Sequence, residues 1–115
     1  MQKIIELKNI EQWETLRKSL TLEDELVIFK FSPVCSISSM VEEDFFTWQS
    51  SLSGKPNLKF AKVNVIDKRE VSRKIADDLQ VLHQSPQVIW LNGNSEVKWT
   101  ASHFDINKES LKAHQ

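Results

Sequence analysis

Cysteine is almost absent from this sequence, since the only one is Cys35. One thiol cannot form a disulfide within the chain, and it cannot supply the paired cysteines of a dithiol redox motif. The three histidines show no HxxxH spacing, so the residue types that hold zinc are not grouped either. The sequence therefore predicts no metal site and leaves any redox chemistry to a single thiol.

An excess of charge of either sign is also lacking, because 15 lysines and arginines are balanced by 16 aspartates and glutamates. A net charge of −1 gives no basic surface for binding nucleic acid. No apolar run reaches the roughly 18 residues of a membrane-spanning helix. The first residues, Met1 to Glu6, lack the apolar stretch and cleavage site of a secretory signal. We therefore expect a cytoplasmic protein that binds neither nucleic acid nor membrane, in a compartment where thiols are kept reduced.

Glycine and proline are scarce, with two and three residues, and repeats and low-complexity tracts are missing. Hydrophobic residues make up 40% of the chain, which is enough for a sizeable core. A length of 115 residues is close to the commonest domain size. Residues 1–115 are therefore expected to form a single domain.

The apolar residues follow two periodicities. Short β-branched and aromatic runs predict strands, and apolar residues three or four positions apart predict helices. The expected strands cover residues 3–7, 26–31, 58–66, 87–91 and 96–101. The expected helices cover residues 10–20, 37–52, 68–79 and 108–114, the third of them capped by Asp67. The order β-α-β-α-β-α-β-β-α resembles the thioredoxin-like α/β fold, a mixed sheet flanked by helices.

The stretch 26–40 places the single thiol between a strand and a helix. Ser32-Pro33 ends the strand, and apolar residues at 37, 40, 41, 45, 48 and 52 then recur at helical spacing. Cys35 is therefore expected at a helix amino terminus, where unpaired N–H groups and the helix dipole favour the thiolate. Such positions lower the pKa of cysteine from its ordinary value of about 8.5. A small apolar core residue is the alternative, although the serine-rich neighbourhood favours a reactive thiol.

Several segments together resemble one protein family. They are Phe29–Ser38, Val71–Ala76, Val81–Val88 and Ala101–Ile106. On these segments the chain is similar to the YtxJ-like monothiol bacilliredoxins, thioredoxin-fold proteins that act on bacillithiol mixed disulfides. The resemblance extends over nearly the whole chain, and its most specific part is the stretch from His83 to Gln87.

The segment around the cysteine departs from the family pattern, which is Lys-His-Ser-x-x-Cys-Pro-Ile-Ser, usually with threonine before the cysteine. The residues that are kept are Cys35, Ile37 and Ser38. Phe31 stands in place of the histidine, Val34 in place of the threonine and Ser36 in place of the proline. The nucleophile is thus retained while its surroundings change.

The resemblance implies a site in which Cys35 is the catalytic nucleophile. The residues predicted to stabilise the thiolate or to line the substrate groove are Pro33, Ser36, Ser38, Ser85 and Pro86. The Ser85–Pro86 bond is expected to be cis, since thioredoxin folds carry a cis-proline that faces the active site. Ser38 has two interpretations, as a hydroxyl donor to the thiolate or as a first-turn serine bonded to its own backbone.

The other candidate residues are interpreted as structural. His83 and His103 are expected to form structural hydrogen bonds, and no role is assigned to His114. All four tryptophans, at positions 13, 48, 90 and 99, fall on apolar periodicities and are expected in the core.

Two functions of different classes remain open. In the first, the thiolate of Cys35 takes bacillithiol from S-thiolated client proteins, and a second thiol from solution clears the adduct. The protein then needs no bound cofactor, and bacillithiol is its co-substrate by resemblance, although glutathione would suit the chemistry equally well. In the second, the chain is a thioredoxin-fold binding or stress-response protein with a weak or vestigial thiol. The changes at Phe31, Val34 and Ser36 motivate this alternative.

Overall fold

The computed structural model describes residues 3–34, 36–52 and 55–115, so Cys35 lies outside the described residues. The strands are β1 (Ile4–Glu6), β2 (Glu25–Phe31), β3 (Leu58–Asn64), β4 (Gln87–Asn92) and β5 (Val97–Ser102). The helices are α1 (Ile10–Ser19), α2 (Ser36–Ser51), α3 (Arg69–Leu79), the 3-10 turn η1 (His103–Asp105) and α4 (Lys108–His114). The order of strands and helices is the one that the sequence predicts, with η1 added before α4.

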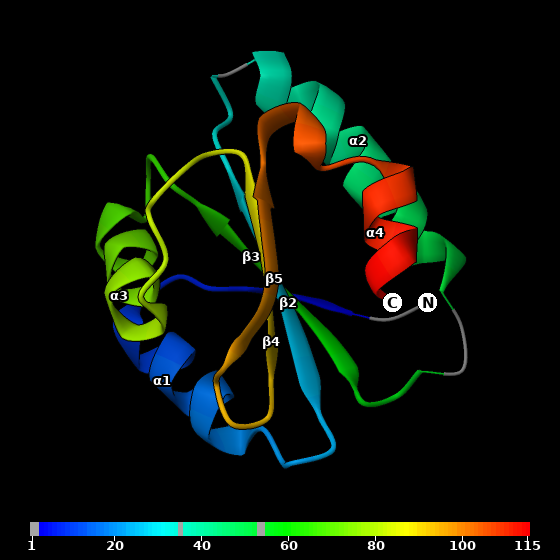
Figure 1. Ribbon diagram of the computed structural model, residues 1–115. Coiled ribbons are helices and arrows are strands. Elements are labelled where there is room, and N and C mark those ends of the chain that lie inside the picture. Colours follow the sequence, from blue (N-terminus) through cyan, green and yellow to red (C-terminus); the bar gives the residue numbers. More distant parts are fainter. Residues whose placement is uncertain (1–2, 35, 53–54) are drawn as a thin grey trace.

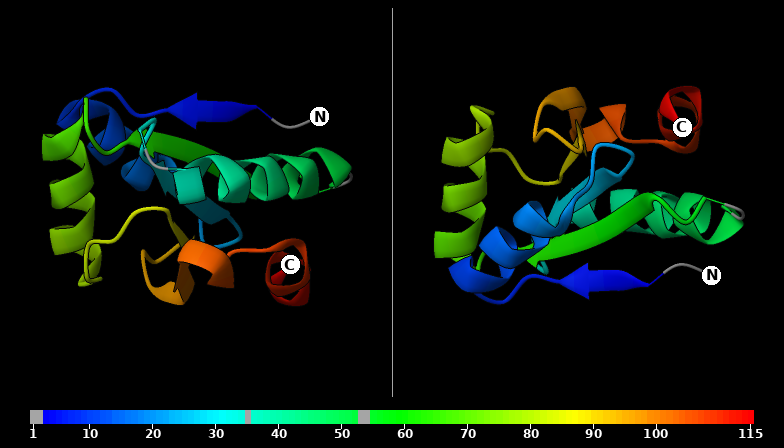
Figure 2. Two further views of the ribbon diagram at one scale, coloured as in Figure 1. Left: turned by 90° about the horizontal axis from the view of Figure 1, so that it is seen from above. Right: turned by 90° about the horizontal axis from the view of Figure 1, so that it is seen from below.

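The strands form one mixed sheet in the order β1-β3-β2-β4-β5. β1, β3 and β2 run parallel, because α1 and α2 return the chain to the same end of the sheet. β4 runs antiparallel to both β2 and β5, so it begins beside the carboxyl end of β2. Figure 2 shows β1 and β5 at the two opposite edges, which leaves β2 in the middle of the sheet.

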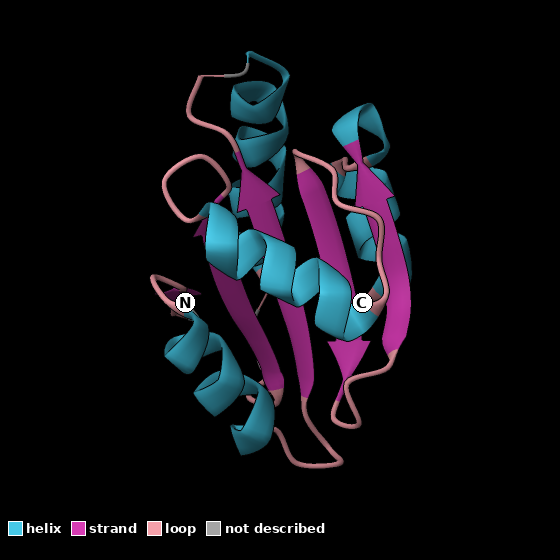
Figure 3. Ribbon diagram, turned by 90° about the vertical axis from the view of Figure 1, so that its left-hand side faces the viewer, coloured by secondary structure: helices cyan, strands magenta, loops and turns pink. Residues whose placement is uncertain are grey.

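Helices cover both faces of the sheet (Figure 1). α1 and α3 lie on one face, in front of the strands in Figure 3, and α2 and α4 lie on the other. The side chains of β2 alternate between two cores: Leu26 and Ile28 pack with α1 and α3, and Val27 and Phe29 pack with α2. Burial on both faces explains why this strand reads as an almost unbroken apolar run.

Aromatic side chains hold α2 against the sheet. Phe45 of α2 stacks on Phe29 of β2 with ring centroids 4.6 Å apart, and Trp48 contacts Trp90 of β4 at 5.7 Å. Aromatic pairs at these separations contribute beyond the area that they bury. Because these rings fix the body of α2, its first residue, Ser36, is held at the carboxyl end of β2.

Within the described ranges, no helix combines the length and the apolar character needed to cross a membrane.

Three of the four tryptophans are buried as expected, and the fourth is not. Trp99 lies on the edge strand β5 and is only half-buried. It stacks on His114 of α4, with ring centroids 4.2 Å apart. The histidine to which the sequence assigns no role therefore covers an aromatic ring that the sheet leaves open.

Met40 does not follow the apolar stripe to which its spacing assigns it. Val41 and Phe45 take the positions that face the sheet, and both are buried. Met40 is 62% exposed and lies on the side of α2 that borders η1. The helix predicted from this spacing is present, but Met40 lies outside its buried stripe.

Asp67 does not cap α3, because its carboxylate belongs to the preceding turn. Asn64 Oδ1 accepts the N–H groups of Ile66 and Asp67 at 3.0 and 3.1 Å, and Asn64 Nδ2 donates to Asp67 Oδ2. α3 begins at Arg69, and Lys68 stands at the N-cap without a side-chain hydrogen bond. The prediction that Asp67 caps α3 is therefore wrong, because the N-cap position lies one residue later, at Lys68.

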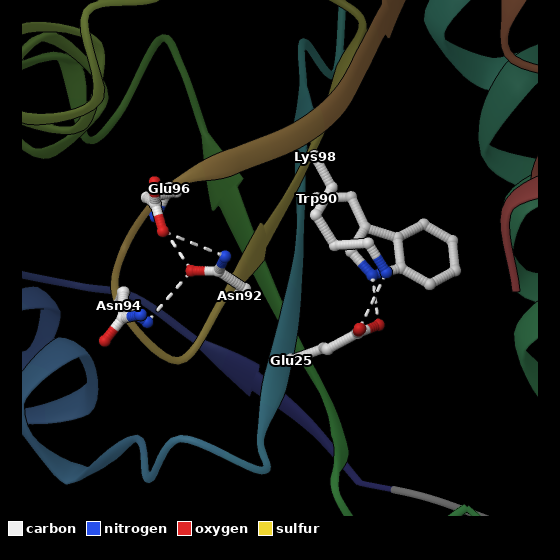
Figure 4. Close-up of polar contacts among 6 residues, drawn as sticks. All are labelled: Glu25, Trp90, Asn92, Asn94, Glu96 and Lys98. Atoms are coloured by element: carbon white, nitrogen blue, oxygen red, sulfur yellow. Dashed lines mark hydrogen bonds and ion pairs between the residues drawn. The ribbon is translucent and has the colours of Figure 1, made fainter.

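Polar contacts organise the end of the sheet where β2 begins (Figure 4). Glu25 accepts hydrogen bonds from Trp90 Nε1 at 2.8 Å and from Lys98 Nζ at 2.6 Å. Although partial burial favours the neutral acid, the bonds from Lys98 and Trp90 hold the pKa of Glu25 below its ordinary value. This network connects the start of β2 with β4 and β5.

The hairpin between β4 and β5 generates a prediction about stability. Gly93 lies in this turn, and a Cβ at its position would overlap the carbonyl oxygen of Thr21 in the loop before β2. We expect Gly93→Ala to lower the free energy of unfolding by about 1–3 kcal/mol, because backbone must move to relieve the overlap. Chemical denaturation measures this change. The neighbouring variant Asn94→Ala is the control and should change stability by less than about 0.5 kcal/mol; equal stability of both variants would contradict the prediction.

Candidate functional site

The candidate site lies where β2 ends and α2 begins. Phe31 is the last residue of β2 and Ser36 is the first of α2. The backbone N–H of Ser32 donates to Ser38 Oγ at 2.9 Å, and the carbonyl of Phe31 accepts the N–H of Val65 at 3.0 Å. These two bonds fix both ends of the short connection that contains Cys35, which is itself outside the described residues.

The predicted site residues in this connection differ in exposure. Pro33 and Ser36 are exposed, as is Val34 between Pro33 and the cysteine. Ser38 is completely buried, and its oxygen accepts a backbone hydrogen bond from Ser32. The bonding of Ser38 to local backbone is therefore observed, whereas its action on the thiolate stays a prediction.

The other predicted pair lies on the neighbouring strand. The Ser85–Pro86 peptide bond is cis, as expected. Pro86 is buried and directly precedes β4, whose first residue, Gln87, pairs with Lys30 near the end of β2. The carbonyl of Pro86 accepts the N–H of His103 at 3.0 Å, which joins this segment to η1. The fold thus brings the pair Ser85 and Pro86 to the same end of the sheet as Pro33, Ser36 and Ser38.

A buried ammonium group beneath this end of the sheet was not predicted. Lys30 is completely buried on the face covered by α3. Its Nζ donates to the carbonyl of Ser72 on α3 at 2.9 Å and lies 3.4 Å from His83 Nδ1. The hydroxyl of Ser72 also contacts His83 Nδ1, at 3.2 Å. Lys30, Ser72 and His83 therefore form one polar cluster that links β2, α3 and the segment before β4.

A second buried polar side chain holds the same segment. Gln87 is 2% exposed and pairs across the strands with Lys30. Its Nε2 donates to the carbonyl of Leu82 at 3.0 Å. In the part of the chain that the structure describes, Gln87 Oε1 and the buried Ser85 Oγ have no hydrogen-bond partner. Polar side chains of β2 and β4, Lys30 and Gln87, thus contact the segment before β4 at His83 and Leu82.

Burial and charge set the protonation of the cluster. Desolvation lowers the pKa of Lys30 from 10.5 to about 8, so this side chain is still mainly an ammonium at neutral pH. Desolvation, followed by the positive charges of Lys30 and Arg73, lowers the pKa of His83. A neutral imidazole that faces an ammonium must accept at Nδ1, which assigns the histidine proton to Nε2. The expectation that His83 is a hydrogen-bonding residue is confirmed.

The sequence contains a signal for Lys30 that periodicity alone did not interpret. It is the only charged residue within the apolar run from Leu26 to Phe31. A strand buried on both faces leaves no exposed position for it, and lysine is rarely buried completely. His103 forms structural hydrogen bonds through its backbone, since its N–H donates to the carbonyl of Pro86 and its carbonyl accepts the N–H of Ile106.

The cluster generates a prediction about pH and stability. Between about pH 8 and 10.5 the unfolded chain keeps a proton on Lys30 that the folded chain has lost, so wild-type stability rises with pH across this window. Lys30→Met lacks this rise. We expect the variant to be more stable than wild type near pH 7, by up to roughly 3 kcal/mol. The advantage should shrink as the pH approaches 10.5, the ordinary lysine pKa.

Urea denaturation at several pH values measures this difference. Lys112→Met, at an exposed position on α4, is the matched control and should leave the pH dependence of wild type unchanged. A difference between Lys30→Met and wild type that is the same at pH 7 and above pH 10 would contradict a desolvated ammonium.

Solved structures with this arrangement are thioredoxin-fold proteins. One, provisionally described as an oxidoreductase with a thioredoxin fold, has a TM-score of 0.79 at 26% identity, over 97% of this chain and 94% of its own. The thioredoxin of Malassezia sympodialis has a TM-score of 0.75 at 14% identity, over 99% and 89% of the two chains. The thioredoxin of Fasciola hepatica has a TM-score of 0.74 at 16% identity, over 96% and 95%. These two thioredoxins support the fold alone, and the fold is the one that the sequence predicts.

A family model identifies the chain more closely. The model of the monothiol bacilliredoxin BrxC matches residues 5–111. This span contains the only cysteine of the sequence, the polar cluster around Lys30 and the segment that ends in Pro86. The resemblance seen in the sequence is thereby confirmed, and the chain belongs to the monothiol bacilliredoxin BrxC family of thioredoxin-fold oxidoreductases.

Proposed function

We propose that this protein is a monothiol thiol–disulfide oxidoreductase that removes bacillithiol from S-thiolated client proteins. The observation that carries the proposal is the match to the bacilliredoxin family over a span that contains the only cysteine. Cys35 directly precedes Ser36, the first residue of α2, in the sequence. A thiol that opens a helix is favoured as the thiolate, which is the attacking form in disulfide exchange.

The reaction proceeds through two exchanges. The thiolate of Cys35 attacks the bacillithiol sulfur of the mixed disulfide, forms a new S–S bond to it and releases the client thiolate. A second bacillithiol thiolate then attacks the bacillithiol sulfur of the adduct. Oxidised bacillithiol leaves, and the Cys35 thiolate is regenerated. The second thiol must come from solution, because the sequence holds no other cysteine.

The low-molecular-weight thiol is the least constrained part of the proposal. The family name supports bacillithiol, whereas the two exchanges would run equally well with glutathione. Turnover also requires a supply of reduced thiol, so we place the reaction in the cytoplasm. Neither thiol is a bound cofactor in this scheme, since each acts as a co-substrate.

A binding or stress-response role with a weak thiol is the second candidate, and one observation favours it. Phe31 replaces the family's histidine. Its ring stacks on that of Phe29, with ring centroids 6.1 Å apart. Its ring therefore extends the aromatic core and offers the thiol no proton donor. Val34, in place of threonine, also lacks a hydroxyl. A Cys35 that titrates at or above about 8.5 would favour this second candidate.

The enzyme proposal is tested with a purified S-bacillithiolated protein and excess bacillithiol. Wild type should release the client thiol, and intact-mass spectrometry without reductant should detect a bacillithiol adduct on the protein. Cys35→Ser should abolish both, because no other side chain can form the adduct. Thr47→Ala, an exposed change on α2, is the control and should retain activity. Intact mixed disulfides and no adduct with wild type would refute the proposal, and a parallel glutathionylated substrate identifies the thiol.

The state of the thiol is tested by alkylation rates against pH. We expect Cys35 to titrate below the ordinary value of about 8.5. Ser36→Pro should raise the pKa of Cys35, because proline removes one N–H at the start of α2 and is tolerated there. Ser36→Ala keeps this N–H and is the matched control. An unchanged pKa in Ser36→Pro would show that the Ser36 amide does not hold the thiolate.

A further inference from the structure

Large apolar side chains are exposed mainly at one end of the molecule. Among the residues that the structure describes, the exposed ones are Leu22, Val34, Met40, Ile66, Leu82 and Phe104. Leu22 lies in the loop before β2, and the other five lie at the end where β2, β3 and β5 finish and where α2 begins. This is the upper end in Figure 1. Where exposed apolar side chains at this end also border a groove, that groove is a candidate interaction site.

One groove at this end of the molecule lies between α2 and η1. It has a volume of about 290 Å³. Val41 and Ile106, both buried, form its floor, and Met40 and Phe104 stand beside it with 62% and 59% of their surfaces exposed. Met40 lies four residues after Ser36 and hence on the same side of α2. The groove therefore begins about one helical turn from the residue that follows Cys35.

The charge of this groove is acidic. Glu43 and Asp44 line it, and no lysine, arginine or histidine is among its lining residues in the described chain. No ion pair is formed by either carboxylate with the residues that the structure describes. Next to the lining residues in the chain, exposed charges of both signs are present, Asp105 beside Phe104 and Lys108 beside Asn107, so the acidic character comes from Glu43 and Asp44. An occupant with an apolar side chain and a neighbouring positive charge would complement this groove.

Charge also discriminates between possible occupants. A second copy of this chain, docked through the same groove across a two-fold axis, would bring the carboxylates of both copies together. Like charges at an interface disfavour association. A peptide with lysine or arginine beside an apolar residue meets no such repulsion, and it would bury the exposed surfaces of Met40 and Phe104.

We infer that this groove binds the polypeptide of the client protein and selects segments in which an apolar side chain lies beside lysine or arginine. The inference rests on the proposed function for the identity of the occupant. The groove holds the client chain, whereas the exchange reaction itself involves only the sulfur atoms. Glu43 and Asp44 are specificity residues in this assignment and take no part in the bond changes.

The test compares substrates that carry the same mixed disulfide. One peptide has a leucine flanked by lysines near its cysteine, a second has glutamates in place of the lysines, and a third has serine in place of the leucine. A small aromatic thiol coupled to bacillithiol serves as a substrate without a polypeptide. Wild type should show the highest kcat/KM with the lysine–leucine peptide, and this preference should weaken with added salt.

The variants reverse the charge and remove the apolar walls. Glu43→Lys/Asp44→Lys should lower kcat/KM for the lysine–leucine peptide by about tenfold and raise it for the glutamate peptide. Met40→Ser/Phe104→Ser should raise KM for both leucine peptides. The small substrate reports any change that the substitutions cause at Cys35 itself, so each peptide kcat/KM is compared as a ratio to that of the small substrate with the same variant. Glu70→Lys/Asp77→Lys alters the net charge equally at exposed positions of α3, across the sheet from the groove, and should retain wild-type preference.

A binding measurement separates this inference from the proposed function. Lysine–leucine and glutamate–leucine peptides without a disulfide are titrated into Cys35→Ser protein, and the methyl resonance of Met40 is followed by NMR. Saturable shifts with the lysine peptide, reduced in Glu43→Lys/Asp44→Lys, support the groove even if no mixed disulfide is turned over. Equal kcat/KM for all peptides, or shifts that are absent or independent of peptide charge, would overturn it.

Discussion

The complete enclosure of β2 is the constraint on which the rest of the structure depends. This strand has a neighbouring strand on each edge and helices on both faces. Its backbone groups are therefore paired with β3 and β4, and its side chains from Leu26 to Lys30 are buried. The strand ends at Phe31. The chain leaves this enclosure four residues before Cys35, so a short connection joins the central strand to the proposed nucleophile. Precise sites are more readily built from such elements than from loops.

Residue periodicity predicted most of this architecture, because burial on a strand or helix face leaves a regular pattern in the sequence. The unbroken apolar run from Leu26 to Phe29 reflects burial on both faces of β2, and the spacing of Val41, Phe45 and Trp48 reflects burial on one face of α2. Periodicity does not reveal where a covering surface ends, so it could not distinguish the exposed Met40 from its buried neighbour Val41. It also cannot show which polar atoms meet in space, and Lys30 is 42 residues from Ser72.

The two ends of the sheet are built by different rules. Where β2 begins, Glu25 accepts hydrogen bonds from Trp90 and Lys98. At the same end, Gly93 lies against the backbone of Thr21 in the loop before β2. Where β2 ends, an ammonium is buried, and Ser85 and Gln87 hold buried oxygens without partners among the described residues. Natural sequences depart from local rules mainly at functional sites. The departures here gather at the end that carries the only cysteine and the apolar groove.

The hydrogen bond from His103 N–H to the Pro86 carbonyl has a consequence for how clients would be chosen. It connects η1, which supplies Phe104 to the groove, directly to the proline next to β4. The two surfaces that a client would touch are thus joined by a bond of 3.0 Å rather than by a flexible loop. A client chain engaged on both would have to match a fixed separation, so the number of residues between its apolar anchor and its modified cysteine is restricted. Client selectivity would then depend on the spacing between these two sequence features as well as on the residue types near the modified cysteine.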